Sequence, residues 1–248
     1  MWNDELPDPD EEEVWQPDED VTTIIGLRCV DGIVLGADSQ RTGTSTKFVR
    51  KPRVFNFKNG VGIFGCAGRA SFIKQVWEIV PDAIRSVKAQ MPKQIADRIL
   101  DSLRGVAMEL GHSHAKKQPN VKIVLAVRCN NPLQFGLFHI DLREEELEQF
   151  DYYAVAGTGS GVAKHAILQF GRGHLPQMTR RQARRLAYYA VRAAKRADDR
   201  SGGPARIFSF GPDNEHAYEL GSTIRSVYRH RAKDAETAWR TTLFGALK

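Results

Sequence analysis

The chain has 248 residues, of which 42% are hydrophobic and 27% charged, and it carries a formal net charge of +6. This composition is typical of a soluble globular protein, and no apolar run approaches the roughly 20 residues that span a bilayer. The acidic amino terminus lacks an apolar segment, which excludes a secretory signal peptide. The three widely spaced cysteines, Cys29, Cys66 and Cys129, make neither a metal pattern nor a disulfide framework. We therefore expect a cytoplasmic protein in which the cysteines have a packing role.

Charge is divided sharply along the chain. Residues 1–21 contain ten Asp or Glu and no Lys or Arg, which leaves the remainder with 36 basic against 20 acidic residues, a net charge of +16. With three prolines as well, residues 1–20 cannot build a core, and we expect residues 1–21 to be a flexible acidic prosegment. The basic body raises the possibility of nucleic-acid binding. Its cations lie mainly in helical stretches such as residues 180–196, which favours a solvated helix face or an assembly contact instead.

The first structured segment reads as a β-hairpin. β-branched residues dominate residues 22–25 and return at Ile33 and Val34, with the turn signal Asp31-Gly32 between them. A two-residue turn there makes the numbers of paired residues sum to about 61 to 63. Asp38 should therefore lie beside the start of the first strand, next to Thr22.

Strand and helix patterns alternate in blocks along the rest of the chain. Residues 51–68 form a second strand pair around Asn59-Gly60, and helical spacing follows from Ala70 to about Gln90 and from Pro92 to about Leu110. Further strands are predicted at 120–128, 134–142, 151–157, 205–210 and 216–220, and further helices after Gly161 and over about 179–198. This order suits an α+β protein, a four-layer αββα sandwich of two antiparallel sheets. No linker divides residues 22–248, so we expect one domain there.

The residues at the hairpin end could carry nucleophilic chemistry. A threonine hydroxyl attacks poorly unless a base takes its proton. If residues 1–21 are removed, Thr22 becomes amino-terminal, and its α-amino group, with a pKa of roughly 7.7 to 8.0, can be that base. Asp38 is the nearby acid and Lys51 the candidate cation that would orient the amine and tune its pKa. The alternative is that Thr22 is an ordinary strand residue, because threonine favours strands.

Five motifs in order carry a family resemblance. They are TTIIGLRCVDGIVLGADSQRT (22–42), VRKPRVF (49–55), GCAGRA (65–70), GTGSG (157–161) and ADDRSGG (197–203). Together they resemble the catalytic β subunits of the proteasome, which are N-terminal-nucleophile hydrolases that cut peptide bonds with a threonine. The resemblance covers about residues 22–221.

The resemblance implies a role for each matching residue. Thr22 would be nucleophile and, through its amine, general base, with Lys51 and Asp38 tuning it. Ser160, Asp198 and Ser201 would hold the amine and a water, and the N–H of Gly68 would bind the oxyanion. The pocket for the residue before the cut would be lined by Arg41, Val49, Arg53, Cys66, Ala70 and Lys74. Its three cations suggest tolerance of acidic substrate side chains.

The resemblance also implies partners. The substrates would be peptides or unfolded proteins, and the subunit would sit in a homo-oligomeric or mixed ring of proteasome-type subunits, fed by an ATPase unfoldase ring. No cofactor, no metal and no membrane is expected, and nucleic acid is a disfavoured partner.

Two departures from the family pattern leave an alternative open. Val21 stands where self-processing subunits usually have glycine, and Gln40 replaces a common arginine and resembles the bacterial HslV peptidase. The branched Val21 would hinder removal of the leader, and the chain as given, with its leader, corresponds to a zymogen. The rival hypothesis is a structural ring subunit whose Thr22 is never unmasked and which has no peptidase activity.

Overall fold

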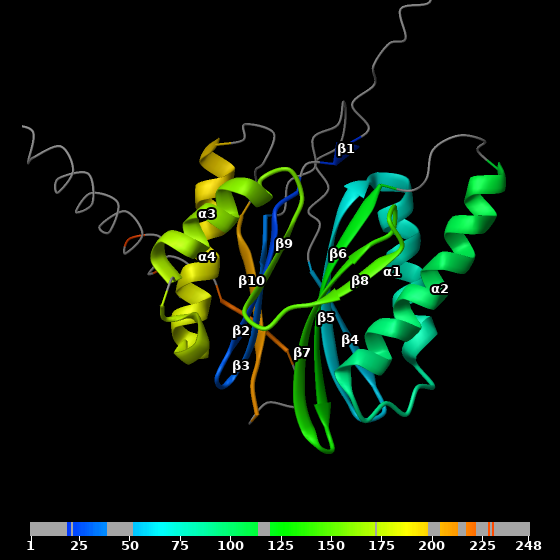
Figure 1. Ribbon diagram of the computed structural model, residues 1–248, viewed down its shortest axis with the longest axis horizontal. Helices are drawn as coiled ribbons and strands as arrows, with labels where there is room; N and C mark the ends of the chain where they lie inside the picture. The colour runs from blue at the N-terminus through cyan, green and yellow to red at the C-terminus, as the bar shows by residue number, and fades with distance from the viewer. Residues whose placement is uncertain are drawn as a thin grey trace, which may run out of the picture.

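Two antiparallel sheets pack face to face with a helix pair on each outer surface (Figure 1). The computed structural model describes residues 19–20, 22–38, 52–113, 120–171, 173–197, 204–212 and 217–221, together with residues 228 and 230. The helices are α1 (Ala70–Ile84), α2 (Pro92–Ser113), α3 (Ser160–Gly171) and α4 (Arg180–Ala197), with a short 3-10 helix at Leu175–Gln177. The strands are β1 (Glu19–Asp20), β2 (Ile24–Cys29), β3 (Gly32–Ala37), β4 (Arg53–Phe57), β5 (Gly60–Arg69), β6 (Val121–Asn130), β7 (Leu133–Asp141), β8 (Glu146–Gln149), β9 (Tyr153–Ala156), β10 (Arg206–Phe210) and β11 (Tyr218–Glu219).

The sheets differ in strand order. Sheet I runs β1-β5-β6-β7-β8, with β4 also paired to β5, and sheet II runs β11-β10-β3-β2-β9. Helices α1 and α2 cover sheet I, and α3 and α4 cover sheet II (Figure 1). The predicted four-layer αββα sandwich is therefore confirmed.

Three apolar layers hold the sandwich together. One lies between sheet I and its helices, one between sheet II and its helices, and one between the two sheets. Strand β2 contributes to two of them, because Ile24 faces the other sheet while Ile25 and Leu27 face α3 and α4. Burial on both faces explains why this strand reads as a nearly continuous apolar run.

The first hairpin has the predicted register. Ile24 pairs with Ala37 and Cys29 with Gly32, so the numbers of each pair sum to 61, at the lower end of the predicted range. The turn residues are Val30 and Asp31. Gly32 has φ of +142°, a conformation that residues with a side chain rarely adopt.

Three elements differ from the sequence prediction. Helix α1 ends at Ile84, although helical spacing predicted about Gln90. The chain turns there, and the N–H groups of Gln90 and Met91 already donate to the Gln94 side chain to cap α2. Strand β8 was not predicted, because this acidic, mostly exposed edge strand lacks an alternating apolar pattern. Strand β1 was also not predicted, since it lies at the end of the segment expected to be flexible.

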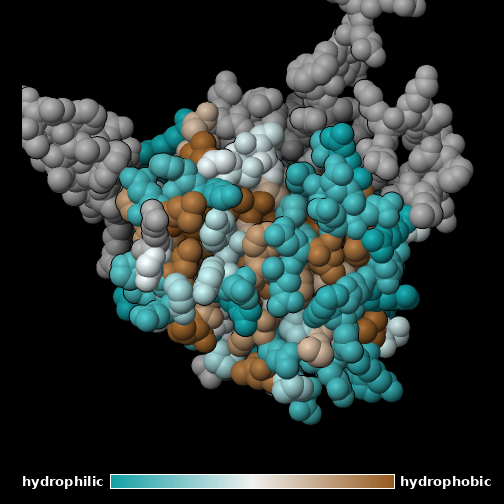
Figure 2. Space-filling model, viewed as in Figure 1, coloured by the Kyte–Doolittle hydropathy of each residue, from teal (hydrophilic) through white to brown (hydrophobic). Residues whose placement is uncertain are grey.

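The surface is uneven in hydropathy. In the view of Figure 2, hydrophilic side chains cover most of the α2 side, whereas hydrophobic side chains gather on the α3 and α4 side. The exposed large hydrophobic residues on α3 are Val162, Leu168 and Phe170. Among the described residues, no helix combines the length and apolar character needed to cross a membrane.

Candidate active site

The predicted nucleophile lies where β2 begins and β3 ends. Asp38 lies opposite Thr23, whose N–H donates to Asp38 Oδ1 over 3.0 Å, while the N–H of Asp38 donates to the Thr23 carbonyl over 3.1 Å. Thr22, the next residue, is only 4% exposed, and Asp38 is fully buried. The hairpin therefore brings a buried carboxylate to the start of β2, as the sequence predicted.

The GTGSG motif folds over Thr22 and Thr23. Strand β9 pairs with β2, which brings Gly157 to the Thr22 backbone. Gly157 has φ of +95°, and a Cβ there would overlap the carbonyl oxygen of Thr22 and lie 3.3 Å from Ala67 Cβ. A Cβ on Gly159 would overlap the Thr23 hydroxyl and lie 2.8 Å from Ala194 Cβ. Both glycines are therefore needed for close approach, and Ser160 begins α3 directly beside them.

Gly68 forms the other wall of the site. It lies near the end of β5 with φ of +129°, and a Cβ there would overlap the carbonyl oxygen of Asn120. Strand β1 pairs with this part of β5, with Asp20 opposite Gly68 and Glu19 opposite Arg69. The chain that leads into Thr22 thus docks as a short antiparallel strand on the predicted oxyanion-binding glycine.

An ion pair near Gly68 was not predicted from the sequence. Lys122 pairs with Ala67 in the β5–β6 register, and its Nζ lies 3.0 Å from Asp141 Oδ2 on β7. Burial raises the pKa of Asp141, but the hydrogen bond and charge of Lys122 outweigh it and hold the pKa below its ordinary value of 3.8. Burial and the Lys122 charge lower the pKa of the neighbouring His139. Lys122 lies on β6 and its partner Asp141 on β7, so no local sequence pattern predicted the pair.

Four of the predicted pocket residues lie on β4, β5 and α1. Cys66 is buried in the layer between sheet I and its helices, Ala70 begins α1, and Lys74 is exposed one turn later. The Arg53 guanidinium lies 4.8 Å from the ring centroid of Trp77 and donates to the Trp77 carbonyl over 3.3 Å. The sequence did not predict a role for Trp77, which is marked there only by lying one helical turn after Lys74.

The remaining predicted site residues lie outside the described part of the chain. They are Arg41, Val49, Lys51, Asp198 and Ser201. The last described residue before Asp198 is Ala197, where α4 ends.

The three cysteines lie in the apolar layers. All three cysteines are buried free thiols, so the predicted packing role is confirmed. Burial raises the pKa of Cys29 to about 12 and that of Cys129 to about 11, which disfavours the reactive thiolate. In the described residues, no cluster of His, Cys, Asp and Glu could hold a metal ion.

Comparisons with known proteins agree with this architecture. Residues 19–209 match the family described as Proteasome subunit. "Proteasome subunit beta 2" from two strains of Saccharolobus solfataricus is 28% identical over 188 residues, which is 73% of this chain and 82% or 81% of the relatives.

Solved structures of Anbu proteins share the fold. Anbu (ancestral beta-subunit) from Yersinia bercovieri superposes with a TM-score of 0.73 at 14% identity, covering 90% of this chain and 97% of that one. The Anbu complex from Pseudomonas aeruginosa, solved as a helical assembly, gives 0.71 at 13% identity, covering 88% and 95%. The fold is that of the N-terminal-nucleophile hydrolases. The chain belongs to the proteasome subunit family, as a β-type subunit.

Proposed function

We propose that this protein is a threonine endopeptidase subunit of a proteasome-like ring assembly, with Thr22 as the amino-terminal nucleophile after removal of residues 1–21. The observation that carries the proposal is the docking of β1. Asp20, two residues before Thr22, pairs with Gly68, and Glu19 pairs with Arg69, in antiparallel register. A peptide substrate entering along the same edge of β5 would have its backbone held in the same way.

The chemistry follows from the groups around Thr22. The free α-amino group takes the hydroxyl proton as Thr22 Oγ1 attacks the substrate carbonyl carbon. The N–H of Gly68 stabilises the oxyanion of the tetrahedral intermediate. The intermediate collapses to an ester on Thr22 as the peptide amine leaves with the proton, and water, activated by the same amine, then hydrolyses the ester.

Supporting residues hold the amine in place. Asp38, already fixed by the Thr23 N–H, would balance the positive charge of Lys51, and this pair would tune the pKa of the amine. Ser160, beside the GTGSG loop, would position the amine and a water together with Asp198 and Ser201. The burial of Thr22 and Asp38 favours strong electrostatic coupling, since water screens little there.

The pocket around α1 supports a preference among substrates. In this proposal, Arg53 and Lys74 would bring positive charge to the side chain before the cut, and Cys66 and Ala70 would also line the pocket. We propose that Arg41 and Val49 complete this pocket. Peptides with an acidic residue before the cut should then be accepted, and Arg53→Gln should reduce their kcat/KM more than that of peptides with an apolar residue there.

Alanine and serine at position 22 test the mechanism. Thr22→Ala removes the nucleophile, so hydrolysis of fluorogenic peptides should fall at least about 1,000-fold, whereas Thr22→Ser keeps a hydroxyl and should retain measurable activity. Lys51→Ala should lose nearly as much as Thr22→Ala. Assembly is checked by size-exclusion chromatography, and intact mass shows whether Thr22 is the amino terminus. Full activity in Thr22→Ala would remove the mechanism.

Val21 favours a second candidate function, a structural ring subunit that keeps its leader. Its branched side chain precedes the bond that must be cut. A threonine-directed epoxyketone separates the candidates, because it modifies only a free amino-terminal threonine. Covalent labelling of the assembled protein supports the peptidase, whereas an intact leader without labelling supports the structural subunit.

A further inference from the structure

A pocket opens at the other end of β2 from Thr22. It encloses about 330 Å³ between the start of α2 and the strands β2, β7 and β8. This volume is within the range of small-molecule sites. Arg28, six residues along β2 from Thr22, lies about 20 Å away from it at the rise of an extended strand. The pocket is therefore separate from the candidate active site.

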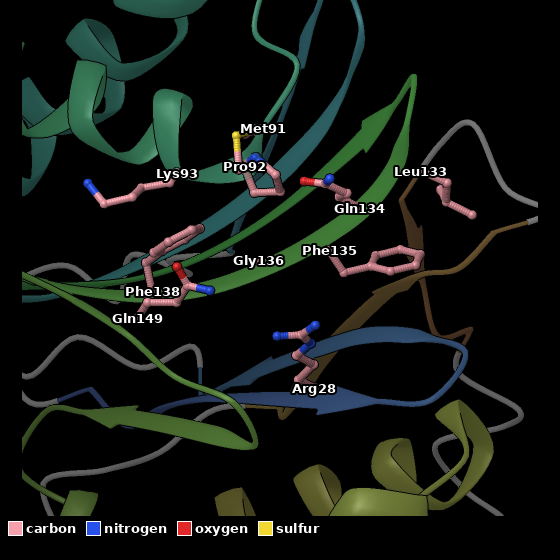
Figure 3. Close-up of a pocket in the computed structure, with 10 residues that line it drawn as sticks. All are labelled: Arg28, Met91, Pro92, Lys93, Leu133, Gln134, Phe135, Gly136, Phe138 and Gln149. Atoms are coloured by element: carbon pink, nitrogen blue, oxygen red, sulfur yellow. The ribbon is translucent and has the colours of Figure 1, made fainter.

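Arg28 supplies the charge that faces the pocket. Figure 3 shows its guanidinium directed toward Gly136 and Phe135, whereas the ammonium of Lys93 points away. Lys93 Nζ is already paired with Asp97 at 2.6 Å. The Arg28 guanidinium lies 3.9 Å from Asp151, beyond hydrogen-bond distance, and the Asp151 side chain is 81% exposed. This weak pair leaves the guanidinium able to bind a carboxylate through two parallel hydrogen bonds.

The other walls combine rings and amides. Phe135, on the face of β7 toward the other sheet, is stacked on Phe210 with centroids 6.2 Å apart, which holds its ring in place. Phe138 borders the pocket from the opposite face of β7, where it is buried against the helices. Gln134 and Gln149 offer side-chain amides, and Met91 with Leu133 adds exposed apolar surface at the rim. Helix α2 adds little polarity, since the Gln94 side chain already accepts the N–H groups of Gln90 and Met91.

The geometry points to a binding site for a small carboxylate with an adjoining apolar or aromatic group. The carboxylate binds Arg28, the apolar group lies against Phe135, and the glutamine amides bind a neighbouring carbonyl. Two sources have this chemistry: a free N-acyl amino acid, and the carboxy-terminal residue of a peptide. The inference does not depend on the proposed peptidase activity.

Titration calorimetry of the assembled protein with three small probes tests the chemistry. N-acetyl-phenylalanine should bind with a Kd of about 1 mM or tighter. Its neutral amide tests the carboxylate, and N-acetylglycine tests the apolar group; each should bind at least about 10-fold more weakly. Equal binding of the amide, or no binding of N-acetyl-phenylalanine at several times this concentration, would overturn the proposal.

Two matched arginine variants test the location. Arg28→Gln should raise the Kd at least about 10-fold, while Arg181→Gln, which removes an exposed charge on α4, should leave it unchanged. Equal weakening by both variants would indicate attraction to the basic body alone and would overturn the site. An acetylated Gly-Gly-Phe peptide distinguishes the sources: binding as tight as the single residue assigns the site to peptide carboxy termini, and much weaker binding assigns it to free small acids.

Discussion

Polar residues at the two ends of β2 lie in opposite environments, one closed and buried and the other open. At the Thr22 end, β9 pairs with β2 and the GTGSG loop closes over Thr22 and Thr23, so that Asp38 is fully buried. At the Arg28 end, the ladder between β9 and β2 stops at the pair Tyr153 with Leu27, and one further hydrogen bond joins the N–H of Arg28 to the Tyr152 carbonyl over 2.8 Å. The chain there leaves an open pocket with a partly exposed arginine.

We infer that the position of glycines, rather than the sequence of the strand, determines which end of β2 is covered by a loop. Gly157 and Gly159 let the loop after β9 touch the backbone and hydroxyl of the two threonines. Among the described residues, no loop contacts Arg28 through glycines in this way. A closed end suits chemistry that needs fixed groups and little water, and an open end suits reversible binding.

The largest effect on the closed end is expected from replacing Gly157 by alanine. Its φ of +95° and its contact with the Thr22 carbonyl leave no room for a methyl group, so Gly157→Ala should lower the free energy of unfolding by at least about 3 kcal/mol. Gly161→Ala in the same motif is the control: nothing lies within 4 Å of its Cβ position, and the change should be within about 1 kcal/mol. Urea denaturation measures both. Equal stabilities of the two variants would contradict the role assigned to Gly157.

A second prediction concerns the chain that enters the closed end. In the proposed peptidase, leader removal would require Thr22 to attack the carbonyl of Val21 through a strained turn, which glycine adopts more cheaply than a β-branched residue. A penalty of about 1 to 2 kcal/mol corresponds to a rate difference of roughly 5- to 30-fold. Val21→Gly should accelerate maturation by that factor, and Val21→Ile should not, as followed by intact mass over time. Wild type maturing as fast as Val21→Gly would refute the strain argument.

A third prediction tests the pH dependence of the closed end. Because the pKa of Asp141 is lowered in the folded protein, the stability from its pair with Lys122 is fully present above about pH 4 and is lost as the pH falls through the folded pKa. Lys122 is partly exposed, so Asp141→Asn should cost only about 0.5 to 1 kcal/mol at pH 7. Unfolding curves at pH 7 and at about pH 2 should show this difference shrinking toward zero. A difference that stays constant would assign the effect to packing rather than charge.

The smallest effect is expected at the open end. Arg28→Gln removes a charge whose nearest acid is 3.9 Å away and mostly exposed. The free energy of unfolding should change by less than about 0.5 kcal/mol. The same urea titration measures it, and a loss of 2 kcal/mol or more would mean that Arg28 is a structural residue.

Features that depend on neighbours along the chain could be predicted from the amino-acid sequence alone. The Asp31-Gly32 turn set the register that brings Asp38 to the start of β2, and apolar spacing located α1 and α2, because turn geometry and helix periodicity are local. The sequence also identified GTGSG and Gly68 as parts of a site, although the roles of Thr22, Ser160 and Gly68 remain predictions.

Features that join distant segments could be read only from the folded chain. The end of α1 at Ile84, the edge strand β8 and the docking of β1 on β5 depend on partners that no local pattern records. The Lys122–Asp141 pair and the pocket at Arg28 likewise arise where separate strands meet. Whether a polar residue becomes buried and paired or stays open to ligand depends on what packs above it, and that is a property of the assembled sheets rather than of any single segment.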